Sequence, residues 1–436
     1  MNVNHFNTFP YGGAAAAAKR LHRQMLDQGT HSRFLYHQAD RAFEQNSTYQ
    51  KVAFLDDEPE GWLAPLTRRF EKSRQRKIHR GYDQHVAERP SHLEVFSMAE
   101  LPVKTRLDWP QNQTDIVHLH WMAFFIDYAS FFASIPDAVP IVWTLHDMNP
   151  LTGGCHYSGS CHQYTKGCGH CPQLADPCFK DVSRQSFSVK QKALRSKKLT
   201  IVTPSKWLRD LAKQSPIWPQ STTFHVIRLG FELDQYQVVD KQQARQKLGL
   251  ETDAVLVGFG AEDINNERKG FHHLLPALEQ LAPNEAIECL VFGSGQIPVG
   301  CNQLPSIHHF GYIDSLEKQT LFYSACDIVV VPSREDNQPQ IGLEAMACGT
   351  PVIGFDAGGI PEYVLPEVTG LLAELGNETD LANKIAWLAE QPMLRRTMGD
   401  QARKMMEAEF DIRTQTEKYL QLYTNLLSHK TSDTTN

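Results

Sequence analysis

Two acidic residues and an amide lie close together in the second half of the sequence. Asp336 is followed directly by Asn337, and seven residues separate Asp336 from Glu344. Carboxylates accept hydrogen bonds from hydroxyl groups, so Asp336 and Glu344 at this spacing could each bind the hydroxyls of a sugar. Taken alone, the two acids have a simpler interpretation, in which Asp336 is solvated and Glu344 caps neighbouring backbone.

The sequence on both sides of the acids predicts the elements that position them. Ile328–Val331 is a run of β-branched residues, which is typical of an inner strand of a parallel sheet, and Pro332 ends it. A polar loop leads to Pro339, which suits the first turn of a helix, and Gly349 suits the helix end. The run Thr350–Phe355 predicts the next strand. These elements form a right-handed βαβ unit.

The start of the predicted helix is an expected anion site. Backbone N–H groups near Gln340 and Ile341 have no partners within the helix, and the helix dipole makes this end positive. In α/β units, ligands bind beyond the carboxyl ends of the strands, where this helix begins. A diphosphate would be stabilised there without a metal ion.

The segment resembles the C-terminal signature of glycosyltransferase family 4, the retaining GT-B glycosyltransferases. That signature has two glutamates separated by seven residues ahead of an AMACGTPV run, which is present here at Ala345–Val352. Asp336 stands where the family has its first Glu. The resemblance implies that Glu344 binds ribose hydroxyls. It implies that Asp336 and Asn337 hold the donor sugar, while the amides near Gln340 and Ile341 remain the expected site of the donor diphosphate.

Weaker motifs extend the resemblance over most of the chain. Gly12 and Gly13 follow an expected strand and precede an expected helix, and they resemble the family's glycine turn that faces the donor phosphates. An apolar run ends in His146, which by resemblance contacts the donor sugar near the reacting centre. The candidates for lining the acceptor side are His118, His120 and Asp147.

The resemblance also implies two cations at the donor diphosphate. Lys269 fits the family's lysine, which precedes a helix expected here over Phe271–Leu281. No arginine occupies the family's arginine position, and Arg268 is expected to supply that charge. Both cations would stabilise the negative charge that develops as the nucleoside diphosphate leaves. Without the resemblance, a solvated basic pair on a loop is an equal interpretation.

The resemblance therefore implies an α/β protein of the GT-B fold, with two Rossmann-like domains whose parallel sheets face each other across a cleft. We expect an acceptor-side domain over residues 1–225, with a cysteine-rich loop at 155–178. A nucleotide-sugar-binding domain is expected over 226–405, and residues 406–436 are expected to form a helix that returns to the first domain, then a polar tail. The length of 436 residues suits two domains.

The implied activity is retaining hexosyl transfer from a nucleoside diphosphate sugar to a saccharide or lipid-linked saccharide, in cell-surface polysaccharide biosynthesis. Lys269, Arg268, His146 and Asp336 would carry the reaction, with no catalytic cofactor. Three alternatives share the fold: a nucleotide-sugar epimerase, a phosphorylase, and a catalytically silent sugar-nucleotide-binding protein. A dinucleotide-binding protein is disfavoured because no complete G-x-G-x-x-G motif occurs.

Four of the nine cysteines cluster in the first half of the chain. Cys155, Cys161, Cys168 and Cys171 have the spacing C-x5-C-x6-C-x2-C. In a reducing compartment this pattern favours a tetrahedral zinc site over disulfides. Such a site would be structural, because four thiolates leave no open position for water. Paired disulfides and free thiols remain alternatives.

The charge balance excludes general nucleic-acid binding, since 43 basic and 50 acidic residues leave a net charge of −7. A basic stretch with neighbouring apolar residues at 62–80 has two interpretations, a solvated helix and a contact with an anionic membrane or lipid diphosphate. No apolar window is long enough to cross a bilayer, and no signal peptide pattern begins the chain. The expected location is the cytoplasm, with peripheral contact to the inner face of the membrane.

Overall fold

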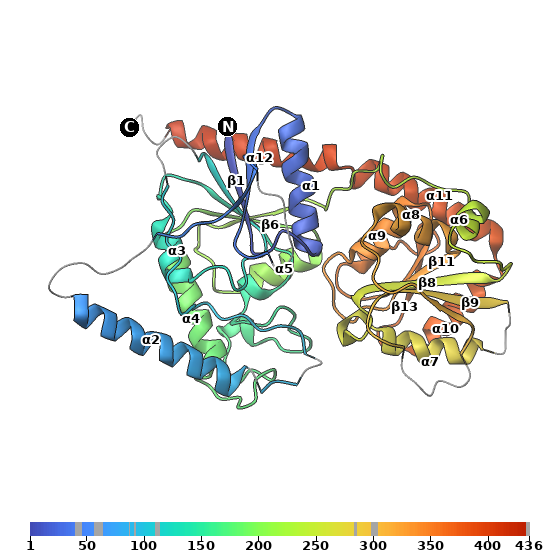
Figure 1. The fold of residues 1–436 in the computed structure, drawn as a ribbon, viewed down its shortest axis with the longest axis horizontal. Coiled ribbons are helices and arrows are strands. Elements are labelled where there is room, and N and C mark those ends of the chain that lie inside the picture. Colours follow the sequence, from blue (N-terminus) through green and yellow to red (C-terminus); the bar gives the residue numbers. More distant parts are fainter. Residues whose placement is uncertain are drawn as a thin grey trace. The chain divides into compact units, whose positions relative to one another are not determined.

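The chain forms two compact units in the computed structural model, which describes residues 1–39, 46–55, 64–86, 88–90, 93–109, 114–282, 286–297 and 304–432. The first unit comprises Met1–Gly230 and Gln415–Asn436, and the second comprises Phe231–Thr414 (Figure 1). These borders fall several residues after those expected at 225 and 405. The reason is that the segments entering and leaving the second unit bond to each other: Phe231 N donates to Phe410 O at 2.8 Å, and Ile412 N donates to Phe231 O at 3.0 Å.

The first unit is built on a parallel sheet with the strand order β3-β2-β1-β4-β5-β6-β7. The strands are β1 (Asn2–Asn7), β2 (His31–Tyr36), β3 (Tyr49–Lys51), β4 (Ile116–Leu119), β5 (Ile141–Thr144), β6 (Leu199–Thr203) and β7 (Thr223–Val226). The helices are α1 (Gly13–Asp27), α2 (Ala64–His85), α3 (Tyr128–Ser134), α4 (Val182–Leu194), α5 (Lys206–Gln214) and α12 (Ile412–Ser432), with short 3₁₀ turns η1 (Asn149–Leu151) and η2 (Gln163–Lys166). The strand order reverses between β1 and β4, which is where ligands bind in such sheets.

Both faces of this sheet are buried, which explains the nearly continuous apolar runs in its strands. One face contributes Phe6 and Trp143 to a core shared with α3 and α4. The other face contributes Val3 and Val142, and α12 packs there through Tyr419, Leu422 and Tyr423. The C-terminal helix thereby belongs to the first unit.

The second unit is built on a parallel sheet with the strand order β10-β9-β8-β11-β12-β13. The strands are β8 (Val255–Asp263), β9 (Ile287–Ser294), β10 (Ile307–His309), β11 (Ile328–Val331), β12 (Val352–Phe355) and β13 (Gly370–Ala373). The helices are α6 (Lys241–Lys247), α7 (Phe271–Leu281), α8 (Leu316–Ala325), α9 (Gln340–Ala347), α10 (Glu378–Ala389) and α11 (Pro392–Glu409), with 3₁₀ turns η3 (Glu267–Lys269) and η4 (Ile360–Glu362). Here the strand order reverses between β8 and β11.

The core of the second unit fixes the strands that carry its loops. Val257 of β8, Val330 of β11 and Ile353 of β12 are fully buried and pack with apolar residues of α7 and α10, such as Leu278 and Ile385. Each such side chain contributes about 1.5–3 kcal/mol through burial, so the carboxyl ends of these three strands are firmly placed.

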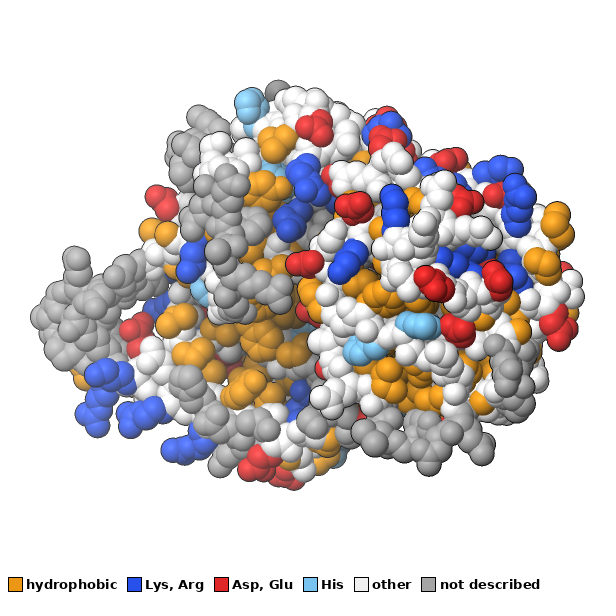
Figure 2. All heavy atoms as spheres, turned by 45° about the vertical axis from the view of Figure 1, so that its right-hand side comes forward, with side chains coloured by type: hydrophobic (Ala, Val, Ile, Leu, Met, Phe, Trp, Pro, Cys, Tyr) orange, Lys and Arg blue, Asp and Glu red, His pale blue; other side chains and the backbone are white. Residues whose placement is uncertain are grey.

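Two features of the structure are relevant to membrane contact: the length and apolar content of its helices, and the distribution of charged side chains on its surface. In the part of the chain that the structure describes, no helix combines the length and the apolar content needed to cross a bilayer. On the face seen in Figure 2, Lys and Arg side chains alternate with Asp and Glu over the second unit. That face of the second unit therefore has no large patch of purely positive or purely negative charge.

Candidate functional site

Three neighbouring strands of the second unit deliver loops to one edge of its sheet. β8, β11 and β12 are adjacent and parallel, so their carboxyl ends meet at the point where the strand order reverses. The loop after β8 carries Arg268 and Lys269, and the loop after β11 carries Asp336 and Asn337. Residues far apart in the sequence thus meet at the predicted donor site.

Asp336 is the centre of this site. Its Oδ2 atom accepts hydrogen bonds from Arg268 Nη1 and Lys269 Nζ, both at 2.7 Å. The Asp336 side chain is 7% exposed, whereas that of Lys269 is 26% exposed. Burial alone would raise the pKa of Asp336, but Lys269 and Arg268 hold this pKa well below its usual range. The group is therefore two cations fixed by one carboxylate.

Two glycines allow the loops to approach this closely. Gly270 has φ +82°, and a Cβ atom added there would lie 1.8 Å from the carbonyl oxygen of Pro332. Gly358 has φ +59°, and its added Cβ would lie 2.1 Å from the carbonyl oxygen of Asp336. Gly359 N also donates to that oxygen at 2.9 Å. Any larger residue at Gly270 or Gly358 would displace the backbone that carries Asp336.

Helix α9 begins directly after this loop. Pro339 is its N-cap residue, and no side chain caps the helix. Asn337 is buried, and Gln340 and Ile341 in the first turn are half-buried. The positive end of the helix and the two cations consequently lie on two neighbouring loops that Asp336 joins, an arrangement that suits an anionic ligand.

Glu344 lies inside α9, and its carboxylate contacts two tyrosines. Its Oε2 accepts from Tyr323 Oη at 2.7 Å, and its Oε1 accepts from Tyr236 Oη at 3.3 Å. The residue is 9% exposed. The tyrosines were not predicted, because Tyr236 is 108 positions away in sequence and no local pattern connects it with Glu344. Ribose binding by Glu344 stays a prediction.

The predicted histidines of the first unit belong to a chain of imidazole rings. His5 Nδ1 lies 3.1 Å from His120 Nε2, and His120 Nδ1 lies 3.3 Å from His146 Nε2. His118 is fully buried and contacts Thr144 Oγ1 and Tyr423 Oη, both at 2.7 Å. His5 was not predicted from the sequence. It lies opposite His118 in the pairing of β1 with β4, and an alignment of these two predicted strands could have indicated it.

Burial keeps these rings neutral. It lowers the pKa of His5, His118 and His120 well below the ordinary value, and it lowers the pKa of His146 to about 4. Ligand atoms of His5, His118 and His120 lie within 4.8 Å of one another. Both ring nitrogens of His118 and of His120 already have partners, so we assign no metal ion to this group.

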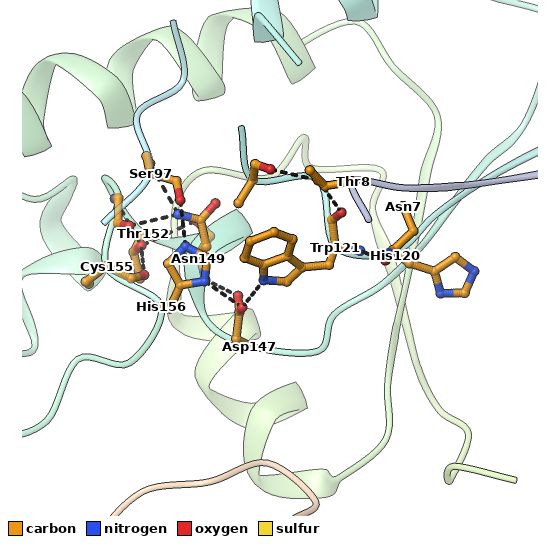
Figure 3. A network of polar contacts seen from close by, with 12 residues as sticks. Asn7, Thr8, Ser97, His120, Trp121, Asp147, Asn149, Thr152, Cys155 and His156 are labelled. Carbon is orange, nitrogen blue, oxygen red and sulfur yellow. Dashed lines mark hydrogen bonds and ion pairs between the residues drawn. The ribbon is translucent and has the colours of Figure 1, made fainter. Parts of the chain in front are cut away.

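Asp147 is the centre of a second polar network, drawn in Figure 3. Its Oδ2 accepts from His156 Nδ1 at 2.6 Å and from Trp121 Nε1 at 2.7 Å, and its Oδ1 accepts from Asn149 N at 2.8 Å. His156 Nε2 in turn lies 2.7 Å from Ser97 Oγ. Burial would raise the pKa of Asp147, but these donors, His156 first, keep it below its usual value.

This network borders a small pocket of the first unit. The pocket is lined by His120, Trp121, Met122, Ala123, Trp143, His146, Asp147, Asn149 and Pro150. The structure therefore brings together three predicted residues, His120, His146 and Asp147, and leaves His118 in the core behind them. Trp121 was not predicted from the sequence.

The predicted glycine turn ends beside α1. Gly12 has φ +86°, a conformation that favours glycine, and it is the N-cap residue of α1 without a side-chain cap. Its carbonyl oxygen accepts from Ala16 N at 2.9 Å. Gly13 is the first residue of the helix.

The basic stretch predicted at 62–80 falls mainly on α2, and residues 62 and 63 lie outside the described part of the chain. Leu66 and Phe70 are 52% and 73% exposed. Arg74 forms an ion pair with Asp127. The exposed basic residues of the helix are Arg69, Lys72, Arg76, Lys77 and Arg80.

Part of the sequence is similar to known glycosyltransferases. Residues 240–405 match the family model described as glycosyl transferases group 1. A D-inositol 3-phosphate glycosyltransferase of Saccharomonospora viridis is 29% identical over 211 residues, which are 44% of this chain and 48% of the relative. The chain thus spans about half the length of the curated relatives it matches.

Two solved structures have a similar fold. Sucrose-phosphate synthase of Thermosynechococcus elongatus superposes with a TM-score of 0.67 at 19% identity, covering 98% of this chain and 100% of that chain. Anabaena HepE, solved in complex with UDP-glucose, superposes with a TM-score of 0.63 at 17% identity, covering 98% and 100%. The predicted α/β fold of two Rossmann-like units, each with a parallel sheet, is confirmed.

Proposed function

Because residues 240–405 match the family model of the group 1 glycosyl transferases, we propose that the chain transfers a sugar from a nucleoside diphosphate sugar to a hydroxyl acceptor with retention of configuration. One observation carries this proposal. Arg268 and Lys269 both form ion pairs with Asp336, and Asp336 lies in the loop that leads directly into α9. Two cations and a helix N-terminus on one edge of a sheet suit a diphosphate better than a neutral ligand.

The charges explain how this edge would promote the reaction. Asp336 neutralises one of its two cations, so the group of three keeps a net positive charge. As the bond between sugar and phosphate breaks, negative charge grows on the leaving diphosphate, and Lys269 and Arg268 stabilise it. Asp336 fixes the position of both cations beforehand, so little reorganisation is required during the reaction.

On the first unit, we assign His146 to the reacting sugar. Its pKa of about 4 leaves the imidazole neutral at physiological pH, so it bonds a hydroxyl group without adding charge. No nucleophile for a covalent intermediate is assigned among the predicted residues. The acceptor hydroxyl then attacks from the side on which the diphosphate leaves, and a phosphate oxygen takes its proton.

We further propose a saccharide or lipid-linked saccharide as acceptor, in cell-surface polysaccharide synthesis at the inner face of the membrane. Helix α2 exposes basic residues together with the apolar side chain of Phe70, and this combination supports contact with anionic lipid. The similarity to an inositol phosphate glycosyltransferase supports a polar, hydroxyl-rich acceptor.

A donor panel tests this function. The purified chain is incubated with UDP and GDP sugars, beginning with UDP-glucose because HepE was solved with it, and with candidate saccharide acceptors. We expect one donor to release nucleoside diphosphate in step with an α- or β-linked product that keeps the donor's anomeric configuration. A product formed from the donor alone would indicate an epimerase, and binding without turnover would indicate a silent protein. Either result would overturn the proposal.

A further inference from the structure

Four partly exposed aromatic side chains gather beside the pocket of the first unit. The ring centre of Trp121 lies 5.9 Å from that of Phe9 and 6.2 Å from that of Phe124. Phe9 stacks in turn on Tyr11, with ring centres 5.4 Å apart. Two of these residues belong to the loop after β1 and two to the loop after β4. The aromatic group therefore lies where the strand order reverses, which is where ligands bind in such sheets.

Trp121 is the member of this group that lines the pocket, and its backbone and ring are both fixed. Its backbone N donates to Asn7 Oδ1 at 2.9 Å. Its carbonyl oxygen accepts from Thr8 N at 2.8 Å and from Thr8 Oγ1 at 2.9 Å. The indole Nε1 donates to Asp147 Oδ2 at 2.7 Å, so that Figure 3 shows the ring between Thr8 and Asp147. The indole is thus oriented before any ligand binds.

The carboxylate that holds the indole is itself held by buried residues. Asp147 Oδ2 also accepts from His156 Nδ1 at 2.6 Å, and His156 Nε2 lies 2.7 Å from Ser97 Oγ (Figure 3). Packing alone would not require this chain of contacts, because a partly exposed indole can turn its N–H group to water. The chain fixes the direction in which the face of Trp121 points.

His156 belongs to the cysteine-rich loop predicted at 155–178. Three of the four clustered cysteines are buried there and one is partly buried, and none forms a disulfide; they are Cys155, Cys168, Cys171 and Cys161. Thr152 Oγ1 donates to the carbonyl oxygen of Cys155 at 2.7 Å, which fixes the start of this loop next to His156. Zinc binding by the cysteines stays a prediction.

The turn after Trp121 has an unusual backbone conformation. Phe124 has φ +62°, in the left-handed region that residues other than glycine rarely adopt. Thr8 Oγ1 donates to the carbonyl oxygen of Ala123 at 2.7 Å and so helps to hold this turn. Such a conformation persists only where the surrounding structure imposes it, and it is typical of ligand sites.

We propose that Trp121 is the surface on which a pyranose ring of the saccharide acceptor stacks, an assignment that rests on the proposed transfer function. The face of an indole is apolar and carries partial negative charge. The C–H groups on the face of a sugar ring carry a small positive charge and fit such a surface. Trp121 would therefore bind the ring itself, whatever the pattern of its hydroxyl groups.

Polar groups of the same pocket suit the hydroxyl groups at the edge of the sugar. His146 and Asp147 both line the pocket with Trp121. Within the described part of the chain, Asp147 Oδ1 accepts one hydrogen bond, from Asn149 N at 2.8 Å. A carboxylate oxygen can accept a second bond, here from a sugar hydroxyl. One apolar face with a few polar groups is typical of sites for small molecules.

A lipid chain fits this pocket less well than a sugar. It would contact the aromatic faces, but it would also cover the carboxylate of Asp147 and the ring of His146 without bonding to them. Covering polar groups without new hydrogen bonds costs free energy. A saccharide ring uses both the aromatic face and the polar groups, so the occupant we assign is a saccharide.

Binding in the absence of donor tests this assignment. The probes are the methyl glycosides of glucose, galactose, mannose and N-acetylglucosamine, followed by saturation-transfer difference NMR with irradiation of the protein's aromatic protons. We expect at least one glycoside to receive saturation mainly on the C–H protons of one ring face. In Trp121→Ala its Kd should rise about tenfold. Trp387→Phe, which changes a 44% exposed tryptophan of α10, is the control and should keep the wild-type Kd.

The wild-type chain decides the matter if Trp121→Ala does not fold. No saturation of any of these glycosides, or saturation spread evenly over both ring faces, would overturn the assignment. An unchanged Kd in folded Trp121→Ala would do the same. Trp121→Phe retains an aromatic face and loses the bond to Asp147, so its Kd should lie between those of the wild type and Trp121→Ala.

Steady-state kinetics separate the acceptor from the donor. With the donor and acceptor that the donor panel identifies, Trp121→Phe should raise the KM for the acceptor and leave the KM for the donor unchanged. A general loss of structure would not produce this difference. A raised KM for the donor alone would show that the ring stacks on the donor sugar, and it would overturn the assignment.

The two proposals fail in different ways. Glycoside binding that depends on Trp121, without transfer from any donor, would contradict the transfer function and leave the stacking surface in place. Transfer with an unchanged acceptor KM in Trp121→Ala would contradict the stacking surface alone.

Discussion

Lys269 Nζ lies 2.7 Å from Asp336 Oδ2. The sequence assigned these residues to different parts of the donor, the lysine to the diphosphate and the acid to the sugar. In the fold they are one group, in which the acid positions the cation. Changes at either residue should therefore affect the same step of the reaction.

Replacement of Lys269 by alanine should abolish most of the transfer while the fold remains. The side chain is 26% exposed, so its loss leaves no buried cavity. A missing charge at the developing diphosphate should lower kcat by roughly 10²–10³. Steady-state kinetics with the best donor measure this effect, and Lys318→Ala, an exposed lysine of the same unit, serves as the control. Full activity of Lys269→Ala would remove the lysine from the mechanism.

Asp336 should stabilise the second unit in a pH-dependent way. Its pKa is depressed in the folded chain, so its contribution to the free energy of unfolding is present above the ordinary Asp pKa of about 3.9. That contribution is lost as the pH falls through the lower folded value. Urea unfolding should show that Asp336→Asn destabilises the chain at pH 7 and that the difference shrinks below about pH 4. The exposed Asp314→Asn provides the comparison, and a difference that grows in acid would refute the assignment.

The two tyrosines at Glu344 should contribute unequally. Tyr323 is fully buried and donates at 2.7 Å, whereas the Tyr236 hydroxyl lies at 3.3 Å. Tyr323→Phe removes a hydrogen bond to a buried charge and should cost about 1.5–3 kcal/mol of stability. Tyr236→Phe should cost less. Both are measured by chemical denaturation, and equal losses would show that the distances do not reflect the strength of the bonds.

The histidines of the first unit should make the protein less stable in mild acid. His5, His118 and His120 have strongly lowered pKa values, and that of His146 falls from 6.5 to about 4. Below about pH 6.5 the unfolded chain binds protons that the folded chain excludes, so stability falls with decreasing pH. Each ring contributes a slope of up to about 1.4 kcal/mol per pH unit.

Unfolding measured from pH 7 to pH 5 tests this dependence. His5→Gln removes one of the buried rings and should flatten the curve, whereas the exposed His162→Gln should leave it unchanged. A flat wild-type curve over this range would contradict neutral, buried rings.

Local patterns determined much of the architecture. The β-branched run at Ile328–Val331, the helix after Pro339 and the glycine at position 349 depend on near neighbours, and the strand and helix lie where those patterns predict them. The AMACGTPV run and the spacing of Asp336 and Glu344 carried the resemblance to glycosyltransferase family 4 for the same reason, because a motif keeps its residues close in sequence.

Contacts between distant segments could only be decided by the tertiary structure. Asp336 with Lys269, Glu344 with Tyr236, and Asp147 with Trp121 join residues separated by 67, 108 and 26 positions. Which side chains meet at the edge of a parallel sheet depends on strand order and register, and these result from packing the whole core. The sequence by itself determined the elements, the family motif and the identities of most candidate residues. The tertiary structure decided which of them share a hydrogen bond, because burial and long-range pairing are properties of the folded chain.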